Sequence, residues 1–114
     1  MGLLSKTSSK EVEAFADGLA EAIAKRYPPA MDAAEQRKVS INRLTKILED
    51  AFEKAAAFQA EHKLGWIKKA SLGNTFRWKL KQLGYSERFI EVATEGLIVR
   101  ISKGEGKKEG GAGK

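Results

Sequence analysis

The sequence has no cysteine, one histidine and two prolines in 114 residues. The lack of cysteine excludes disulfides, thiolate metal sites and cysteine nucleophiles. The single histidine, His62, follows Phe58 and Gln59 at the helical positions four and three residues before it. No metal-binding pair of the His-x-x-x-His or Glu-x-x-His kind can therefore form there. We expect no metal, no other cofactor and no enzymatic activity.

Long apolar runs are missing as well. No stretch of about 18 apolar residues is present, and the apolar stretch after Met1 is too short for a secretory signal. The chain is 42% hydrophobic and 32% charged, which is typical of a globular protein. The lack of cysteine fits a reducing compartment. We therefore expect a cytoplasmic protein without a membrane partner.

Positive charge is present in excess, and one stretch carries all of it. The net charge is +6; residues 63–85 contain six cations and no acid, whereas residues 1–62 have a net charge of −1 and residues 86–114 of +1. Both tryptophans lie in this basic stretch. Cations beside flat aromatic rings suit a polyanion that carries stackable bases. The same composition also describes the basic face of an ordinary helical domain.

Apolar residues at steps of three and four predict an all-α fold, a small four-helix domain. The expected helices cover residues 10–27, 32–62, 74–83 and 86–101. Ser8 and Glu11 have the spacing of a capping box at the start of the first helix, which ends before the two prolines at 28–29. Asp32 has the same spacing for the second helix. The alternative there is a short turn followed by a helix that Ser40 caps.

Glycines divide the rest of the chain. Gly65 is expected to end the long second helix, and Gly73 to interrupt the basic stretch, so that Asn74 caps the third helix. Gly18 lies inside the first helix, where it would mark a close contact between helices. Residues 97–101 have the composition of a strand, but no other strand is predicted to pair with them, and we favour a continued helix.

These helices define a single domain. Residues 1–9 are expected to form a flexible N-terminus, 10–102 one helical domain, and 103–114 a disordered tail rich in glycine and lysine. The first two, long helices would pack antiparallel, and the two short C-terminal helices would close over one end. The expected core consists of Val12, Phe15, Leu19, Ile23, Ile41, Leu44, Leu48, Phe52, Leu80, Leu83, Phe89 and Ile90.

One tryptophan of the basic stretch is placed unusually. On a helical wheel of residues 74–83, Trp78 lies opposite the core side, beside Arg77 and Lys81. Packing under the long helix or a dimer mate is the favoured explanation, because tryptophan is among the most buried side chains; stacking on a base and a cation–π contact are the alternatives. The candidate nucleic-acid-binding residues are Lys68, Lys69, Arg77, Trp78, Lys79, Lys81 and Trp66.

Two functions follow as hypotheses. The first is a small non-enzymatic nucleic-acid-binding protein that holds phosphates with these cations and stacks bases on the tryptophans. The last helix would not read DNA, because Glu87, Glu91 and Glu95 outweigh Arg88 and would repel it. The alternative is a helical interaction or assembly module, an adaptor or a homodimer. Its basic segment would bind an acidic protein partner or the acidic first helix of a second copy.

Overall fold

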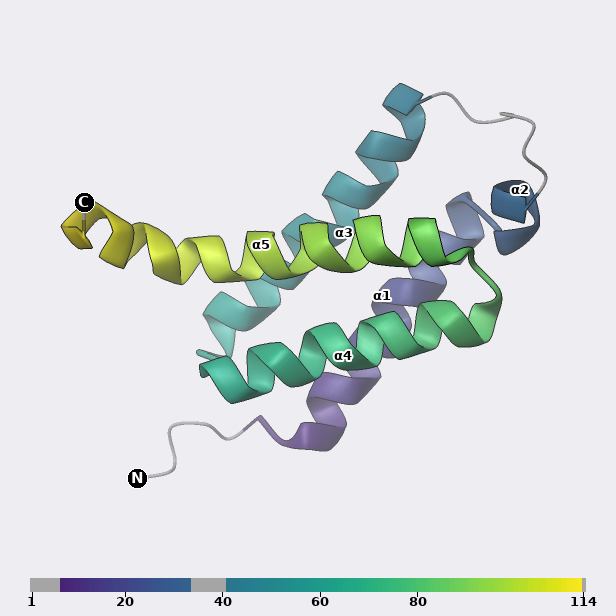
Figure 1. Cartoon of the computed structure of the whole chain (residues 1–114). Coiled ribbons are helices and arrows are strands. Elements are labelled where there is room, and N and C mark those ends of the chain that lie inside the picture. The colour runs from purple at the N-terminus through teal and green to yellow at the C-terminus, as the bar shows by residue number, and fades with distance from the viewer. Residues whose placement is uncertain (1–6, 34–40, 114) are drawn as a thin grey trace.

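The computed structural model of the chain describes residues 7–33 and 41–113, with side chains for 7–32 and 41–102 (Figure 1). Every regular element in these ranges is a helix, so the all-α prediction is confirmed. The elements are α1 (Ser9–Arg26), α2 (Pro29–Ala33), α3 (Ile41–Glu61), α4 (Trp66–Leu83) and α5 (Glu87–Gly113).

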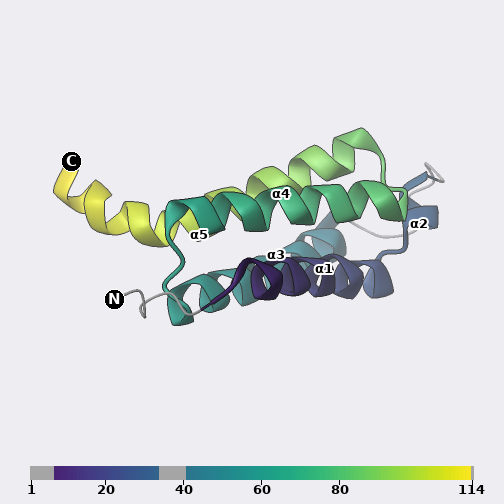
Figure 2. The ribbon, with the colours of Figure 1, turned by 90° about the horizontal axis from the view of Figure 1, so that it is seen from below.

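The four long helices form two layers, which Figure 2 shows one above the other. α1 and α3 run antiparallel in one layer, as predicted, and α4 and α5 run antiparallel in the other (Figures 1 and 2). Contacts join α1 to α3 and α4 to α5, and the two layers meet where α1 packs on α4 and α3 on α5. The expectation that two short C-terminal helices close over one end is wrong, because α4 and α5 are long enough to form a complete layer.

α1 begins where the sequence predicts. The Ser8 hydroxyl accepts a hydrogen bond from the backbone of Glu11, and the Glu11 carboxylate accepts one from the backbone of Ser8. This capping box satisfies amide groups that the first turn of a helix leaves without partners. Just before it, Thr7 is buried, with its Oγ1 2.7 Å from Nδ1 of His62 at the end of α3. Residues 1–6 of the expected flexible N-terminus lie outside the described residues.

Two helices, α2 and α3, occupy the segment in which the sequence favours one helix over 32–62. Residues 34–40, which include the alternative cap, lie outside the described residues. The prediction that Asp32 caps a helix is wrong, because Asp32 lies inside α2. Its carboxylate instead accepts hydrogen bonds from the Tyr27 hydroxyl at 3.1 Å and the Ser86 amide at 2.7 Å. Asp32 thereby joins the end of α1 to the start of α5.

The start of α3 is exposed. Ile41, which we expected in the core, is 70% exposed, because the first turns of α3 extend beyond α5 in Figure 1. The buried side of α3 begins at Ile47 and includes Leu48 and Phe52. The apolar residues of α3 therefore begin before the part of the helix that other helices cover.

α3 ends at a lysine in a left-handed conformation. Lys63 has a φ of 46°, the Lys63 amide donates to the Ala60 carbonyl, and the Leu64 amide donates to the Gln59 carbonyl. This pattern is a Schellman motif, in which glycine is the usual residue at the left-handed position. Gly65, the glycine that we expected to end the helix, is instead the N-cap of α4.

α4 is one continuous helix across the predicted break. Gly73 is buried inside it, and a Cβ at that position would lie 2.7 Å from Cδ1 of Ile98 on α5. Gly73 therefore allows α4 and α5 to approach closely, and the prediction that it interrupts the helix is wrong. Asn74 is an exposed residue in the middle of the helix and caps nothing.

α5 contains residues 97–101, so the favoured helical interpretation of this segment is confirmed. Ser86 caps the helix, with its hydroxyl accepting from the Phe89 amide. Gly96 packs against the ring of Phe52 on α3. The helix extends through 103–113, where the sequence predicts a disordered tail; no side chain of this segment is described, and the disorder stays a prediction.

The core lies between the two layers. Of the expected core residues, Phe15, Leu44 and Leu83 are partly buried, Ile41 is exposed and the others are buried. Buried side chains absent from that expectation include Tyr27, Ile47, Leu64, Leu72, Phe76, Tyr85, Leu97 and Ile101.

Candidate interaction surface

All seven candidate site residues lie on α4, but the helix directs them to different sides. Lys69 is buried, on the side that packs into the core. Lys79 forms an ion pair with Glu21 of α1, with 3.2 Å between Nζ and Oε2. Lys68 is half-buried and lies within about 20° of Lys79 on a helical wheel, so it points toward α1 as well. Three of the five cations assigned to phosphate binding therefore lie beneath or beside the outer surface.

The outward side of α4 carries the other four candidates and three further residues. All seven are exposed, and they span about 120° of the helix circumference and about 22 Å of its length. This set, termed the α4 face, consists of Trp66, Ile67, Ala70, Asn74, Arg77, Trp78 and Lys81. It contains no acid. Trp66 is 75% exposed and Trp78 is 59% exposed, so both indoles are accessible to a partner.

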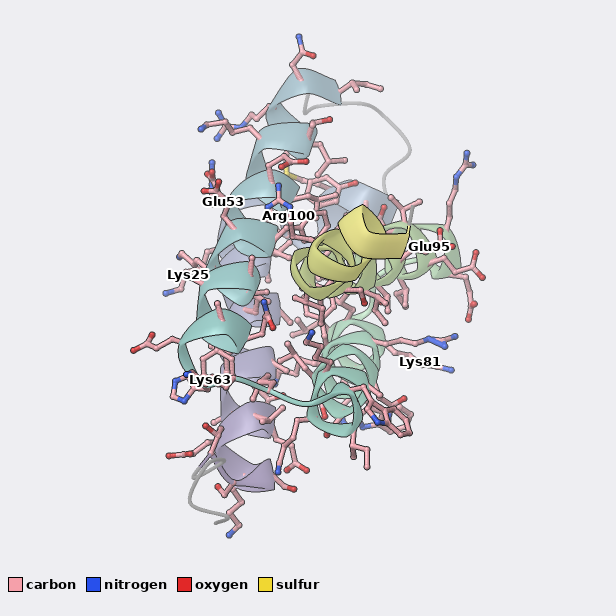
Figure 3. All side chains as sticks on the ribbon, turned by 90° about the vertical axis from the view of Figure 1, so that its left-hand side faces the viewer. Lys25, Glu53, Lys63, Lys81, Glu95 and Arg100 are labelled. Atoms are coloured by element: carbon pink, nitrogen blue, oxygen red, sulfur yellow. The ribbon has the colours of Figure 1, made fainter. Side chains whose placement is uncertain are left out.

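The neighbouring helix of the same layer carries acids on its outward side. Its exposed residues, termed the α5 face, are Glu87, Arg88, Glu91, Val92, Glu95, Ile98, Val99 and Ser102. Figure 3 looks almost along α4 and α5 and shows Lys81 and Glu95 projecting from the same side of this layer. Lys63, which belongs to the basic stretch of the sequence, projects on the opposite side of the molecule. The outer surface of the layer is thus half basic and half acidic.

The charges on these two faces are not paired with one another. Within the described residues, Arg77 and Lys81 form no ion pair, and neither do Glu87, Glu91 and Glu95. All five side chains are on exposed residues. They are therefore available to oppositely charged groups of a partner.

Large apolar side chains are exposed on the same layer. Among the described residues, all but one of the exposed large apolar side chains belong to α4 and α5: Trp66, Ile67, Trp78, Val92, Ile98 and Val99. Ile98 lies over Gly73, where the two helices meet. Scattered single apolar residues are normal on a surface, whereas a set that covers adjoining helices is typical of an interaction surface.

Sequence reasoning missed Ile67 and the two valines. The assumed break at Gly73 separated Ile67 from Trp78; in a continuous helix they are eleven residues apart and lie within about 20° of each other. Val92 and Val99 are seven residues apart and align on α5 in the same way. A helical wheel of the predicted helix 86–101 already shows the alignment of the two valines.

Neither a metal centre nor a membrane span is found in the part of the chain that the structure describes. No group of three or more His, Asp or Glu side chains in these ranges could hold a metal ion. No helix there is long and apolar enough to cross a membrane. Comparisons with protein-family models, curated proteins and solved structures gave no match to this chain.

Proposed function

We propose that this protein is a helical protein–protein interaction module that binds through the outer surface of the α4/α5 layer. The observation that carries the proposal is the exposure of Trp66, Ile67 and Trp78 along one side of α4, next to two cations that form no ion pair with the described residues. Tryptophan and arginine are the residue types most enriched among the energetically dominant contacts of protein interfaces.

The two exposed indoles make a large apolar contribution to association, but it does not cover the cost of binding by itself. Covering the exposed parts of the two indoles removes on the order of 250 Å² from water, which corresponds to about 6 kcal/mol before the costs of association. Those costs are about 4–15 kcal/mol. The indoles alone therefore do not suffice, and the aliphatic residues and complementary charges around them are needed as well.

Nucleic-acid binding, the first hypothesis from the sequence, is the second candidate. The acid-free α4 face with its two accessible indoles favours it. The electrostatics favour it less, because only Arg77 and Lys81 flank Trp78 and the carboxylates of the α5 face lie on the neighbouring helix. About two phosphate contacts on a single strand give only a roughly 7-fold loss of affinity between 50 and 200 mM salt.

Site-specific photo-crosslinking distinguishes the two candidates. A photoreactive benzoylphenylalanine replaces Asn74, at the centre of the α4 face, and in a matched control it replaces exposed Glu53 on α3. In cells that naturally make this protein, we expect covalent adducts with other protein chains at position 74. Their yield should be several times the yield at position 53. Equal yields at both positions would overturn the proposal. Adducts with RNA or DNA at position 74 would replace it by the second candidate.

A further inference from the structure

The α4 face and the α5 face complement each other in charge and in apolar content. We infer that the partner of this surface is a second copy of the chain, with the α4 face of each protomer on the α5 face of the other. The inference rests on the proposed function, because it names the partner of the same surface. It replaces the acidic first helix, which the sequence suggested as the complementary element, by α5.

A two-fold axis pairs the α4 face of each copy with the α5 face of the other, because α4 and α5 lie side by side in the same layer. α4 and α5 lie side by side and antiparallel (Figures 1 and 2). A two-fold axis that lies on this layer, between the two helices and parallel to them, places α4 of one copy over α5 of the other, and the reverse contact forms at the same time. An axis in the same plane but perpendicular to the helices would place α4 over α4 and oppose like charges. The charges therefore select the first axis.

The register of the pairing follows from the contact of Gly73 with Ile98, which fixes where the two helices lie along their common direction. Rotation about an axis parallel to the helices leaves these positions unchanged. Arg77 is four residues after Gly73, and Glu95 is three residues before Ile98, so their axial positions differ by about 1.5 Å.

Two further pairs meet at the same register. Lys81 of one copy comes opposite Glu91 of the second copy, and Trp78 comes opposite Val92 of the second copy, each within about 1.5 Å along the helix axis. In these three pairs, opposite charges or apolar groups thus face each other without any adjustable shift.

The lateral positions agree with this register. On helical wheels, Trp66 and Arg77 lie on the edge of the α4 face nearer to α5, Lys81 lies at its middle, and Trp78 lies on its far edge. On the α5 face, Glu91 is nearer to α4, and Val92 lies on the far edge. The two-fold rotation places far edge on far edge, so the contact of Trp78 with Val92 lies outside and the two ion pairs lie nearer to the axis.

The size of the surface predicts a moderate affinity. Two adjacent helices of this length present about 27 Å by 20 Å, on the order of 500 Å² in projection. Specific interfaces begin at roughly 600 Å² of accessible surface on each partner. We therefore expect a dimer with a dissociation constant in the micromolar range, not an obligate one.

Sedimentation equilibrium of the full chain, over about 1 µM to 1 mM, tests the inference with charge-reversed variants. R77E/K81E places acid opposite acid, and E91K/E95K places base opposite base. Each variant alone should dimerise about 10-fold or more weakly than the parent. An equimolar mixture of the two should form a heterodimer, because both contacts then join opposite charges, and the four-fold variant should dimerise like the parent.

The control is E13K/E53K, which changes the net charge as E91K/E95K does, at exposed positions on the other layer. It should dimerise like the parent, and circular dichroism should show every variant folded. A parent chain that stays monomeric at about 1 mM overturns the inference. So does a dimer whose affinity the variants leave unchanged. If position 74 still crosslinks to other proteins in either case, the proposed function stands and only the identity of the partner is wrong.

Discussion

Alanine substitutions at three glycines separate the local and tertiary contributions to the stability of this fold. Gly18, Gly73 and Gly96 all lie inside helices, so each change to alanine gains about 1 kcal/mol of helix propensity. Their surroundings differ. An added Cβ meets nothing within 4 Å at Gly18, lies 2.7 Å from Cδ1 of Ile98 at Gly73, and lies 2.7 Å from two ring carbons of Phe52 at Gly96.

The cost of the added methyl group depends on what it meets. Ile98 is 39% exposed and can turn its terminal carbon away for about 1 kcal/mol, which offsets the gain at Gly73. Phe52 is buried between α3 and α5, and moving its ring overpacks the core at a cost of about 1–3 kcal/mol. We therefore expect Gly18→Ala to raise the free energy of unfolding by about 1 kcal/mol, Gly73→Ala to leave it nearly unchanged, and Gly96→Ala to lower it by about 1 kcal/mol.

Urea unfolding followed by circular dichroism, at one protein concentration, measures all three changes as shifts of the midpoint with an unchanged slope. Replacing Phe52 with leucine in the Gly96→Ala background should recover part of the loss, which a double-mutant cycle detects as coupling. If Gly96→Ala stabilises the chain as much as Gly18→Ala does, the close contact between α3 and α5 does not exist and the arrangement of the layers is wrong.

Three further changes test other contacts. Lys63→Gly should raise the free energy of unfolding by about 1 kcal/mol, because the positive φ of Lys63 strains a residue that has a Cβ; a lower urea midpoint would contradict the helix end described here. Burial raises the pKa of the Tyr85 hydroxyl, which donates a hydrogen bond to the Tyr27 carbonyl. The unfolded chain therefore loses this proton first, and stability falls as the pH rises above about 10. Tyr85→Phe should lower the free energy of unfolding at neutral pH by about 1–3 kcal/mol, yet this free energy should then fall less steeply between about pH 9 and 11. Urea melts at several pH values measure this; the same pH dependence in the variant and the parent would show that Tyr85 does not cause the loss of stability. Thr7→Val should cost about 1 kcal/mol in the same melts through loss of the contact with His62, and no change would mean that this contact does not anchor the start of α1.

Local signals in the sequence located α1 almost to the residue. The capping box, the apolar stripe and the proline pair act within one or two turns of helix, so the amino acids alone specify them. The second helix was harder, because its apolar pattern runs past the surface that covers it and leaves Ile41 exposed. The turn at Lys63 carried no recognisable signal, because a lysine occupies a position that glycine usually takes.

The candidate site was predicted in part. The wheel placed Trp78, Arg77 and Lys81 away from the core side of their helix, and all three residues are exposed. It could not foresee that Lys79 pairs with Glu21, because this ion pair joins residues of different helices.

The sequence by itself determined that this protein is helical, where α1 starts, and which side of α4 carries an indole beside two cations. Each of these depends on residues within a few turns of one another. Only the tertiary structure decided which glycines lie where helices meet, which lysines are drawn inward, and that the basic side of α4 lies beside the acidic side of α5. These depend on contacts between distant residues, and the packing of one helix on another forms them.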